Sequence, residues 1–372
     1  MNPTPPSSPV SPAAAASPVP PVDVSDYVRL APSRMSTMAW EYVSGGAADE
    51  VTLGWNEERY RAIRLRPDFL VDVSKIDTRV TLFGREMPLP LLLAPAAYQK
   101  LLHPDGELAT VKGAGLAGTT MVLSTTSTVS IEDTARVATQ PLWFQLYVQP
   151  DREVTRSLVQ RAEAAGCQAL VITIDSPVLG PRYRETRSRF TLPAGMERAN
   201  LRGLKAATGA QRATGGTIYS AVQDPTVTWQ DVAWLRSLTS LPVLLKGIMN
   251  PDDAARAVDA GVQGIIVSNH GGRNVDTVPA TIDALAPVAE RVAGRIPVLV
   301  DGGVRRGTDI LKAVALGASA VLIGRPYLYG LAVGGSEGVA HVINILRREL
   351  EMAMASTGRP TIASINSSVI WR

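Results

Sequence analysis

The chain has 372 residues, of which 45% are hydrophobic and 19% charged, and this composition is typical of a soluble globular protein with one large domain or two small ones. Its net charge of +3 is too small to indicate a nucleic-acid partner, and no apolar run reaches the roughly 20 residues that a membrane helix needs. The single cysteine, Cys167, excludes an internal disulfide framework and favours a reducing, cytoplasmic compartment.

Residues 1–24 are predicted to form a disordered extension. Eight prolines fall within residues 1–22, and the first basic residue is Arg29, so this stretch lacks the basic start and apolar core of a signal peptide. Residues 25–88 are predicted to form a helical segment that caps the rest of the chain, residues 89–372.

Eight apolar runs rich in Val, Ile and Leu alternate with amphipathic, helix-like segments in residues 89–372, as expected of strands buried on both faces of a parallel sheet. The runs are Leu89–Ala97, Thr119–Thr125, Leu142–Val148, Ala169–Asp175, Val243–Ile248, Gly264–His270, Pro297–Gly303 and Ala320–Arg325. Eight strand–helix units predict an α/β fold that closes into a (β/α)8 TIM barrel. A doubly wound sheet is the alternative, but no GxGxxG turn follows the first strand.

A long insertion separates the fourth and fifth predicted strands. Its first part, residues 177–216, contains eight basic and two acidic residues, a net charge of +6. Long insertions in compact domains are usually lids or disordered segments. A basic lid over the strand ends would raise the local concentration of an anionic substrate, although a solvated loop that happens to be basic would have the same composition.

The stretch GIIVSNHGGRNVD, residues 264–276, brings a histidine and an arginine to the end of a buried strand. His270 is able to move a proton, and Arg273 is able to bind a carboxylate. Taken alone, this stretch is also compatible with a surface loop that carries an incidental histidine.

Polar residues recur at the carboxyl ends of the other predicted strands, which is where barrel enzymes place their chemistry. These strand-end residues are Ser124, Gln145, Tyr147, Thr173, Asp175, Lys246, Ser268, Asp301 and Arg325, and Ala96 and Ala97 close the first strand. Packing alone does not explain the pattern, because an unpaired buried charge is costly. After the seventh and eighth strands, DGGVRRG and GRP predict a phosphate site that combines glycine backbone N–H groups with Arg305 and Arg325.

These motifs together resemble the FMN-dependent 2-hydroxy-acid oxidase and dehydrogenase family, which includes glycolate, lactate and hydroxymandelate oxidases. The resemblance extends from about residue 26 to about residue 364 and rests on SNHGGR (268–273), FQLYV (144–148), DSPVLGPR (175–182), LKGI (245–248), VDGGVRRG (300–307) and LIGRP (322–326). APAAYQKLLHPDGE (94–107) is most similar to the hydroxymandelate-oxidase branch.

The resemblance implies a role for each matching residue. His270 matches the active-site base, Asp175 the carboxylate that pairs with it, Tyr147 the tyrosine beside the substrate hydroxyl, and Lys246 the lysine near flavin N1. Tyr42, Arg182 and Arg273 match the residues that bind the substrate carboxylate. Tyr98 comes directly after Ala96 and Ala97, which match flavin contacts, and is expected to project into the substrate pocket. The positions that match cofactor contacts are Ala96, Ala97, Ser124, Gln145, Thr173, Lys246, Ser268, Asp301, Gly303, Arg305, Gly324 and Arg325.

Single residues among these also fit simpler roles. Tyr42 could cap a helix, Asp175 could be a turn residue, and Lys246 could form a Schiff base, although an aldolase would not require the pair of His270 and Arg273. The sequence also departs from the family pattern. Asn274 and Val275 replace the usual Gln-Leu after Arg273, and Thr126 stands where plant glycolate oxidases carry tryptophan. These departures leave the identity of the substrate open.

The family resemblance implies oxidation of an (S)-2-hydroxy acid to a 2-oxo acid, with FMN as cofactor and O₂ as electron acceptor giving hydrogen peroxide. It also implies a homotetramer, no metal, and no membrane partner. One alternative is a soluble dehydrogenase that uses a quinone or protein acceptor, and a more remote one is a flavin-free lyase or isomerase that acts on a phosphorylated substrate.

Overall fold

The computed structural model describes residues 20–203, 218 and 223–371. The predicted extension lies outside the described residues up to residue 19. Its predicted end overlaps the first helix, because Asp23 caps α1 (Val24–Leu30) by accepting a hydrogen bond from the N–H of Asp26. Asp23 also forms an ion pair with Arg306 at 2.7 Å, so this end of the chain is held to the barrel.

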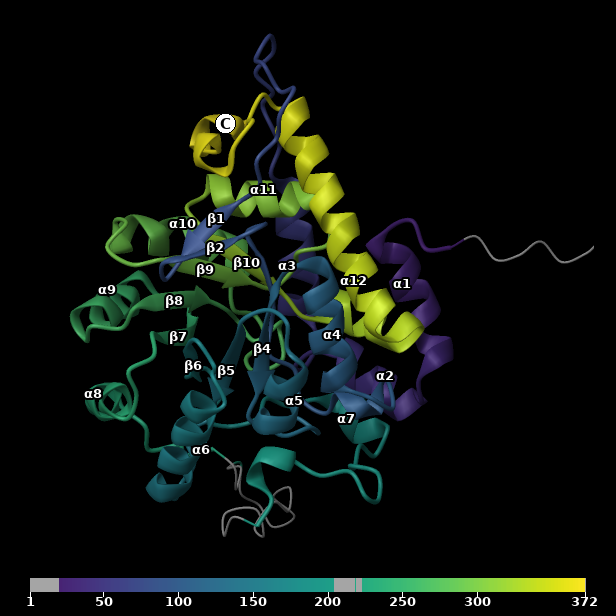
Figure 1. The fold of residues 1–372 in the computed structure, drawn as a ribbon, viewed down its shortest axis with the longest axis vertical. Coiled ribbons are helices and arrows are strands. Elements are labelled where there is room, and N and C mark those ends of the chain that lie inside the picture. Colours follow the sequence, from purple (N-terminus) through teal and green to yellow (C-terminus); the bar gives the residue numbers. More distant parts are fainter. Residues whose placement is uncertain (1–19, 204–217, 219–222, 372) are drawn as a thin grey trace, which may run out of the picture.

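Eight parallel strands form a closed barrel in the order β10-β3-β4-β5-β6-β7-β8-β9, which confirms the predicted fold (Figure 1). The strands are β3 (Leu91–Leu93), β4 (Thr120–Ser124), β5 (Leu142–Leu146), β6 (Leu170–Thr173), β7 (Val243–Ile248), β8 (Gly264–Val267), β9 (Val298–Asp301) and β10 (Ala320–Ile323). All eight lie within the predicted apolar runs, and every residue of β4 and β5 is buried, as expected of strands covered on both faces. The polar ends of several runs fall just beyond the strands, in the loops that form the site.

Helices surround the barrel (Figure 1). They are α4 (Glu107–Ala117), α5 (Ile131–Val137), α6 (Arg152–Ala164), α8 (Trp229–Ser237), α9 (Pro251–Asp259), α10 (Thr281–Val292), α11 (Gly307–Ala315) and α12 (Arg325–Ser356). Side-chain caps at Ser130, Asp151 and Asn250 begin three of them by accepting backbone N–H bonds. Gly118 ends α4 at φ 70°, a left-handed conformation that glycine adopts without steric cost.

The N-terminal segment is only partly helical. After α1, the helices α2 (Thr37–Ser44) and α3 (Val51–Ala62) follow, and no helix is assigned between Ala62 and the barrel. This stretch instead ends in the antiparallel hairpin of β1 (Val80–Leu82) and β2 (Arg85–Met87). Apolar side chains of the hairpin pack against the inward-facing residues of the barrel strands, so the hairpin closes the amino end of the barrel.

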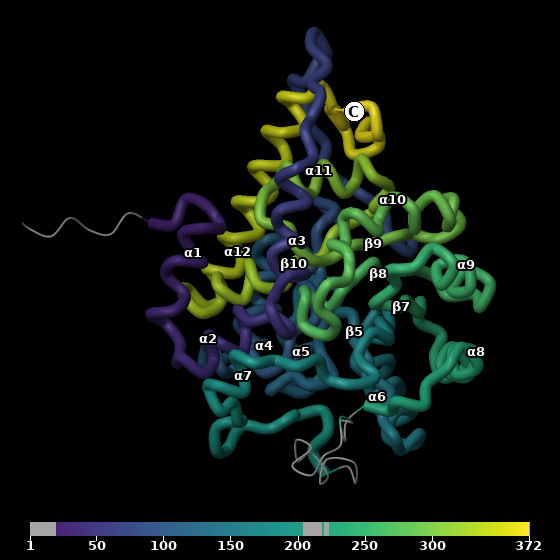
Figure 2. Tube along the Cα trace, turned by 180° about the vertical axis from the view of Figure 1, so that it is seen from behind, coloured from purple at the N-terminus to yellow at the C-terminus, as the bar shows by residue number. Residues whose placement is uncertain are grey.

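Helix α1 lies along α12 in both views of the molecule (Figures 1 and 2). Helix α2 contacts α7 (Tyr183–Arg187), which belongs to the insertion that follows β6. Arg184 of α7 forms an ion pair with Glu41 and donates a hydrogen bond to Ser44 Oγ at 2.8 Å. The N-terminal segment and the described part of the predicted lid therefore meet at the carboxyl end of the barrel. Residues 204–216 of the predicted lid lie outside the described residues.

Candidate active site

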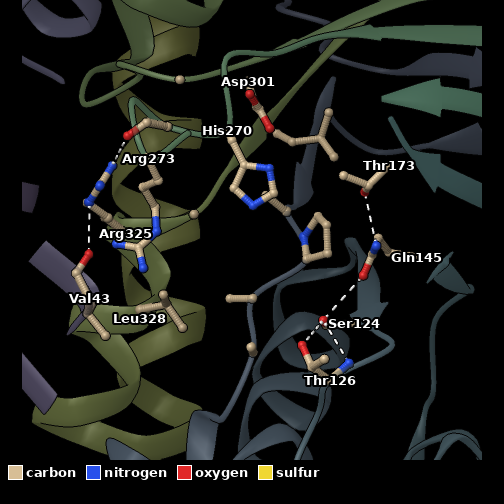
Figure 3. A pocket seen from close by; sticks show the side chains of 18 of the residues that line it. Val43, Ser124, Thr126, Gln145, Thr173, His270, Arg273, Asp301, Arg325 and Leu328 are labelled. Atoms are coloured by element: carbon tan, nitrogen blue, oxygen red, sulfur yellow. Dashed lines mark hydrogen bonds between the residues drawn. The ribbon is translucent and has the colours of Figure 1, made fainter. Parts of the chain in front are cut away.

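A cavity of about 270 Å³ opens at the carboxyl ends of the strands (Figure 3). Most residues predicted for the site line it, and they come from eight strand ends, α2 and the insertion: Tyr42, Ala96, Ala97, Tyr98, Ser124, Gln145, Tyr147, Thr173, Arg182, Lys246, His270, Arg273, Asp301, Gly303, Arg305, Gly324 and Arg325. Asp175 and Ser268 do not line the cavity. They lie behind it and contact residues that do.

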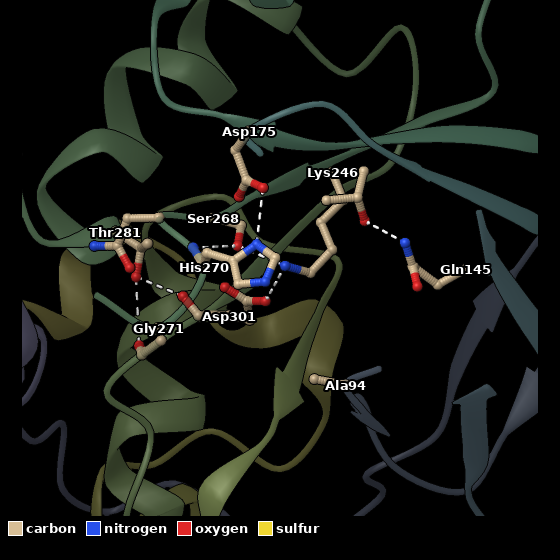
Figure 4. A network of polar contacts seen from close by, with 12 residues as sticks. Ala94, Gln145, Asp175, Lys246, Ser268, His270, Gly271, Thr281 and Asp301 are labelled. Carbon is tan, nitrogen blue, oxygen red and sulfur yellow. Dashed lines mark hydrogen bonds and ion pairs between the residues drawn. The ribbon is translucent and has the colours of Figure 1, made fainter. Parts of the chain in front are cut away.

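His270 follows β8 in a left-handed conformation, with φ 58°. Such a backbone is rare for a residue other than glycine and is typical of functional sites. His270 Nδ1 is 2.8 Å from Asp175 Oδ1 (Figure 4). The Tyr147 hydroxyl is 3.4 Å from His270 Nε2. With Nδ1–H donated to Asp175, Nε2 is left as the proton-accepting nitrogen on the side of Tyr147.

The electrostatics of this pair favour a neutral imidazole. Burial lowers the pKa of His270 below its usual value, and the charge of Asp175 opposes this shift without overcoming it. Burial would raise the pKa of Asp175, but the charge and hydrogen bond of His270 outweigh it and hold that pKa below its usual value. An ionised Asp175 beside a neutral His270 is the arrangement that a general base requires.

Arg182 and Arg273 lie together, and each keeps N–H donors that no described residue accepts. Arg273 donates from Nη1 to the carbonyls of Tyr42 and Gly45, both at 2.7 Å, and from Nη2 to Glu185 at 2.9 Å. Arg182 donates from Nε to the Arg273 carbonyl and from Nη1 to Glu185. Because a guanidinium has five donors, both side chains retain the capacity to bind a carboxylate.

Glu185 is a site residue that sequence reasoning missed. It is 4% exposed, and the same carboxylate oxygen accepts from both arginines. Burial and the nearby Arg182 lower the pKa of Arg273, and Glu185 opposes that shift. The clamp of Arg182, Arg273 and Glu185 therefore carries one net positive charge, which matches one carboxylate. The i, i+3 spacing of Arg182 and Glu185 in PRYRE was the available signal.

Lys246 lines the cavity and is held by two neighbouring side chains. Its ammonium lies 2.9 Å from Asp301 Oδ2 and donates to Ser268 Oγ at 2.7 Å (Figure 4). Burial acts to lower the pKa of Lys246, but Asp301 and Asp175 raise it above its usual value, so the cation persists at neutral pH. The buried Oδ1 of Asp301 has no hydrogen-bond partner in the described structure.

Arg325 also lines the cavity, close to Arg273, since both donate to the Gly45 carbonyl, and it has no acidic partner among the described residues. It donates to the carbonyl of Val43 at 2.9 Å (Figure 3) and to those of Gly45 and Gly271 at 2.8 and 2.9 Å. Desolvation lowers its pKa to about 10. Nothing lies within 4 Å of the position that a Cβ on Gly324 would occupy. Arg305, by contrast, pairs with Glu57 at 2.9 Å. The region around Gly324 thus combines open space with a cation that lacks an acidic partner among the described residues, which suits an anion.

Comparison with known proteins agrees with this geometry. The family model of FMN-dependent dehydrogenases matches residues 31–372. The chain belongs to this family. An L-lactate oxidase of Nostoc sp. is 49% identical over 94% of this chain and 98% of its own length, and a peroxisomal (S)-2-hydroxy-acid oxidase of Oryza sativa subsp. japonica is 47% identical over 94% and 95%. A crystal structure of mandelate oxidase with (S)-2-phenylpropionate superposes with a TM-score of 0.85 at 38% identity, covering 94% of this chain and 98% of that one.

The cofactor of the family is FMN, and the cavity fits it. Arg325 beside the open space at Gly324 suits a phosphate, and the unpartnered Oδ1 of Asp301 suits a ribityl hydroxyl. On the far wall, Gln145 accepts from Ser124 and donates to Thr173 Oγ1 at 3.0 Å, so a polar edge faces the cavity between these ends (Figure 3). The flavin-free alternative is set aside by the family assignment.

Other residues of the cavity were not predicted for the site. Leu179, Phe190, Arg198 and Gln223 reach it from the insertion, where no periodic pattern marks their positions, and Thr126 was noted only as a departure from the family. Among the described residues, no cluster of His, Cys, Asp and Glu suits a metal ion, and no helix has the length and apolar character needed to cross a membrane.

Replacing Asp175 with Asn should lower the pKa of His270 further, because the neutral amide removes the charge that raises it. Histidine-selective NMR titration of both proteins measures this pKa directly. The wild-type value should lie below the ordinary 6.5, and the signals of His103 and His341 serve as internal controls. A higher pKa in the variant would contradict the ion pair.

Replacing Glu185 with Gln should destabilise the fold by about 3–5 kcal/mol, because two neighbouring buried guanidinium groups lose their shared counter-charge. Glu197→Gln is the matched control, since its partner Arg202 is exposed and such pairs contribute at most about 1 kcal/mol. Urea unfolding compares the two variants, and a simple carboxylate such as acetate should restore more stability to the Glu185 variant. Equal losses in both would show that Glu185 does not offset the clamp.

Proposed function

We propose that the protein oxidises an (S)-2-hydroxy acid to the 2-oxo acid and passes two electrons and two protons to O₂, which leaves as hydrogen peroxide. The observation that carries this proposal is the convergence of a neutral, Asp-paired His270 and a carboxylate clamp in one cavity that also fits FMN. The oxidase names of the relatives favour O₂ over a quinone or protein acceptor.

The clamp binds and orients the substrate. The free donors of Arg182 and Arg273 hold the substrate carboxylate, with Tyr42 beside them, since the Arg273 guanidinium lies 5.0 Å from the centre of the Tyr42 ring. A hydroxyl on the adjacent carbon then faces His270 Nε2 and the Tyr147 hydroxyl. Fixing both groups in one geometry converts part of the binding energy into catalysis.

His270 removes the proton and Asp175 stabilises the product of that transfer. Nε2 takes the hydroxyl proton, and the ionised Asp175 at 2.8 Å stabilises the imidazolium that forms. Burial raises the pKa of Tyr147, so this residue stays a neutral hydrogen-bond donor beside the reacting oxygen. FMN, when bound, supplies the two-electron chemistry, and the buried cation of Lys246 offsets negative charge that builds up near it.

The proposed cofactor contacts come from residues that line the cavity or support those that do. They are Ala96, Ala97, Ser124, Gln145, Thr173, Lys246, Ser268, Asp301, Gly303, Arg305, Gly324 and Arg325. Tyr98 lines the cavity beside Tyr42, with ring centres 5.8 Å apart, and is proposed to contact the substituent on the substrate's second carbon. Mandelate-, lactate- and glycolate-like acids are the proposed range of substrates.

We further propose that the protein is a homotetramer and that it is located in the cytoplasm. The tetramer rests on the family resemblance, and the cytoplasm rests on the single cysteine, Cys167, which is buried and free. The named peroxisomal relative makes the peroxisome the competing location. Size-exclusion chromatography with light scattering tests the tetramer.

The cofactor and the base are tested together. Denatured protein should release FMN, with no FAD or NAD, and His270→Ala should retain the flavin while anaerobic flavin reduction by a 2-hydroxy acid slows by at least about 10²–10⁴-fold. Val275→Ala is the control, because Val275 follows the same motif and is 62% exposed. An oxygen electrode with peroxide detection identifies the acceptor. Flavin-free protein, or a His270 variant as fast as the control, would refute the proposal.

A further inference from the structure

An aromatic wall with a cation at each end lines the substrate side of the cavity. Tyr42 and Phe190 stack with ring centres 4.4 Å apart, and Tyr98 lies 5.8 Å from Tyr42. The Arg273 guanidinium lies over Tyr42 at 5.0 Å, and that of Arg198 lies over Tyr98 at 5.7 Å. The two cations are therefore linked through the rings of Tyr42 and Tyr98 by successive steps of 5.0, 5.8 and 5.7 Å.

Arg198 is held in place by Tyr98. Its Nε donates to the Tyr98 hydroxyl at 2.8 Å, and both residues line the cavity. The backbone of Tyr98 is itself constrained, since its φ of 56° lies in the left-handed region. The half-buried Arg198 keeps its terminal nitrogens without a hydrogen-bond acceptor among the described residues.

The neighbouring cations are paired with acidic residues, whereas Arg198 is not. Glu185 offsets the clamp arginines, Asp301 pairs with Lys246, and Glu57 pairs with Arg305. Every Asp and Glu of the chain lies within the described residues, and none of them forms an ion pair with Arg198. Its sequence neighbour Glu197 pairs instead with Arg202.

Two cations of the cavity thus lack an acidic partner in the described structure, and only one has an assigned ligand. Arg325 lies beside the open space at Gly324, which suits the FMN phosphate. The clamp carries one net positive charge and is satisfied by one carboxylate. Arg198 therefore remains available for a second charged group on the substrate.

We propose that Arg198 and the Tyr98 hydroxyl form a distal anion subsite, and that the preferred substrate is a 2-hydroxy acid with a second carboxylate at the far end of its substituent. This inference rests on the proposed function. The first carboxylate occupies the Arg182–Arg273 clamp, the apolar stem lies along Tyr42 and Tyr98, and the second carboxylate accepts from the free Arg198 nitrogens. A partly desolvated guanidinium binds a carboxylate more strongly than a neutral amide.

The test compares substrates that differ only in the distal charge. The probes are 2-hydroxyglutarate and its neutral 5-amide, with lactate as a reference that does not reach Arg198. The wild-type protein should favour the diacid on the order of 10- to 100-fold in kcat/KM. In Arg198→Met this preference should fall to about 2-fold or less, whereas Arg198→Lys should retain part of it, because the charge remains but the planar fork is lost.

Arg202→Met is the matched control. It removes a charge from the same insertion, but Arg202 is 69% exposed and lies outside the cavity lining, so the preference should stay as in the wild-type protein. FMN content and the visible spectrum confirm that each variant is folded. A second measurement uses the products: the dissociation constant of 2-oxoglutarate, read from the flavin spectrum, should rise in Arg198→Met more than that of its neutral amide.

Three results would overturn the subsite: no preference for the diacid in the wild-type protein, an unchanged preference in Arg198→Met, or equal losses with the diacid and the amide. The last result would mean that Arg198 only orients Tyr98. Oxidation of lactate without preference for the diacid contradicts the subsite alone. Failure of all three acids to reduce the flavin contradicts the proposed function, and the product-binding comparison still decides whether Arg198 binds an anion.

Discussion

Compensation of buried charge is the constraint on which the rest of the site depends. A barrel whose strands are covered on both faces offers little water to an isolated cation, and the cost of burying one without a partner is high. The structure meets this constraint with local ion pairs: Asp301 pairs with Lys246, and Glu185 pairs with both Arg182 and Arg273. Each group leaves a defined residual charge, and that residual charge determines which anions the cavity can hold. The same logic applies to the base, where the low pKa of His270 follows from its burial and Asp175 limits the shift.

The barrel and most of the cavity were predictable from the sequence because they depend on local patterns. Strands buried on both faces appear in the sequence as continuous apolar runs. The polar residues that end those runs, such as Gln145 and His270, therefore lie at the carboxyl edge of the barrel. Asp175 and Ser268 also end such runs. Whether a strand-end residue faces the cavity or a neighbour behind it depends on the conformation of a single loop residue, and sequence periodicity does not fix that. The two nevertheless act on the site, through His270 and Lys246.

Residues of the insertion could not be predicted in the same way. Glu185, Phe190 and Arg198 reach the cavity because the chain after β6 folds back over it. Apart from the i, i+3 spacing of Arg182 and Glu185, no repeat of period two or 3.6 marks their positions. Their contacts join segments far apart in the sequence: Glu185 with Arg273, Phe190 with Tyr42, and Arg198 with Tyr98. The net charge of the insertion was visible in the sequence, but which arginines are neutralised and which remain available depends on these long-range pairs.

The carboxyl end of α2 links the N-terminal segment to this same charge pattern. The last carbonyls of a helix lack internal partners and carry partial negative charge, so they attract cations. Here Arg273 binds the carbonyls of Tyr42 and Gly45, while Arg325 binds those of Val43 and Gly45. One arginine is proposed to bind the substrate carboxylate and the other the FMN phosphate, so a single helix end sets the position of both. Tyr42 on the same turn begins the aromatic wall. The predicted cap segment thus contributes both Tyr42 and the carbonyls that hold the two arginines, and its removal would release these arginines.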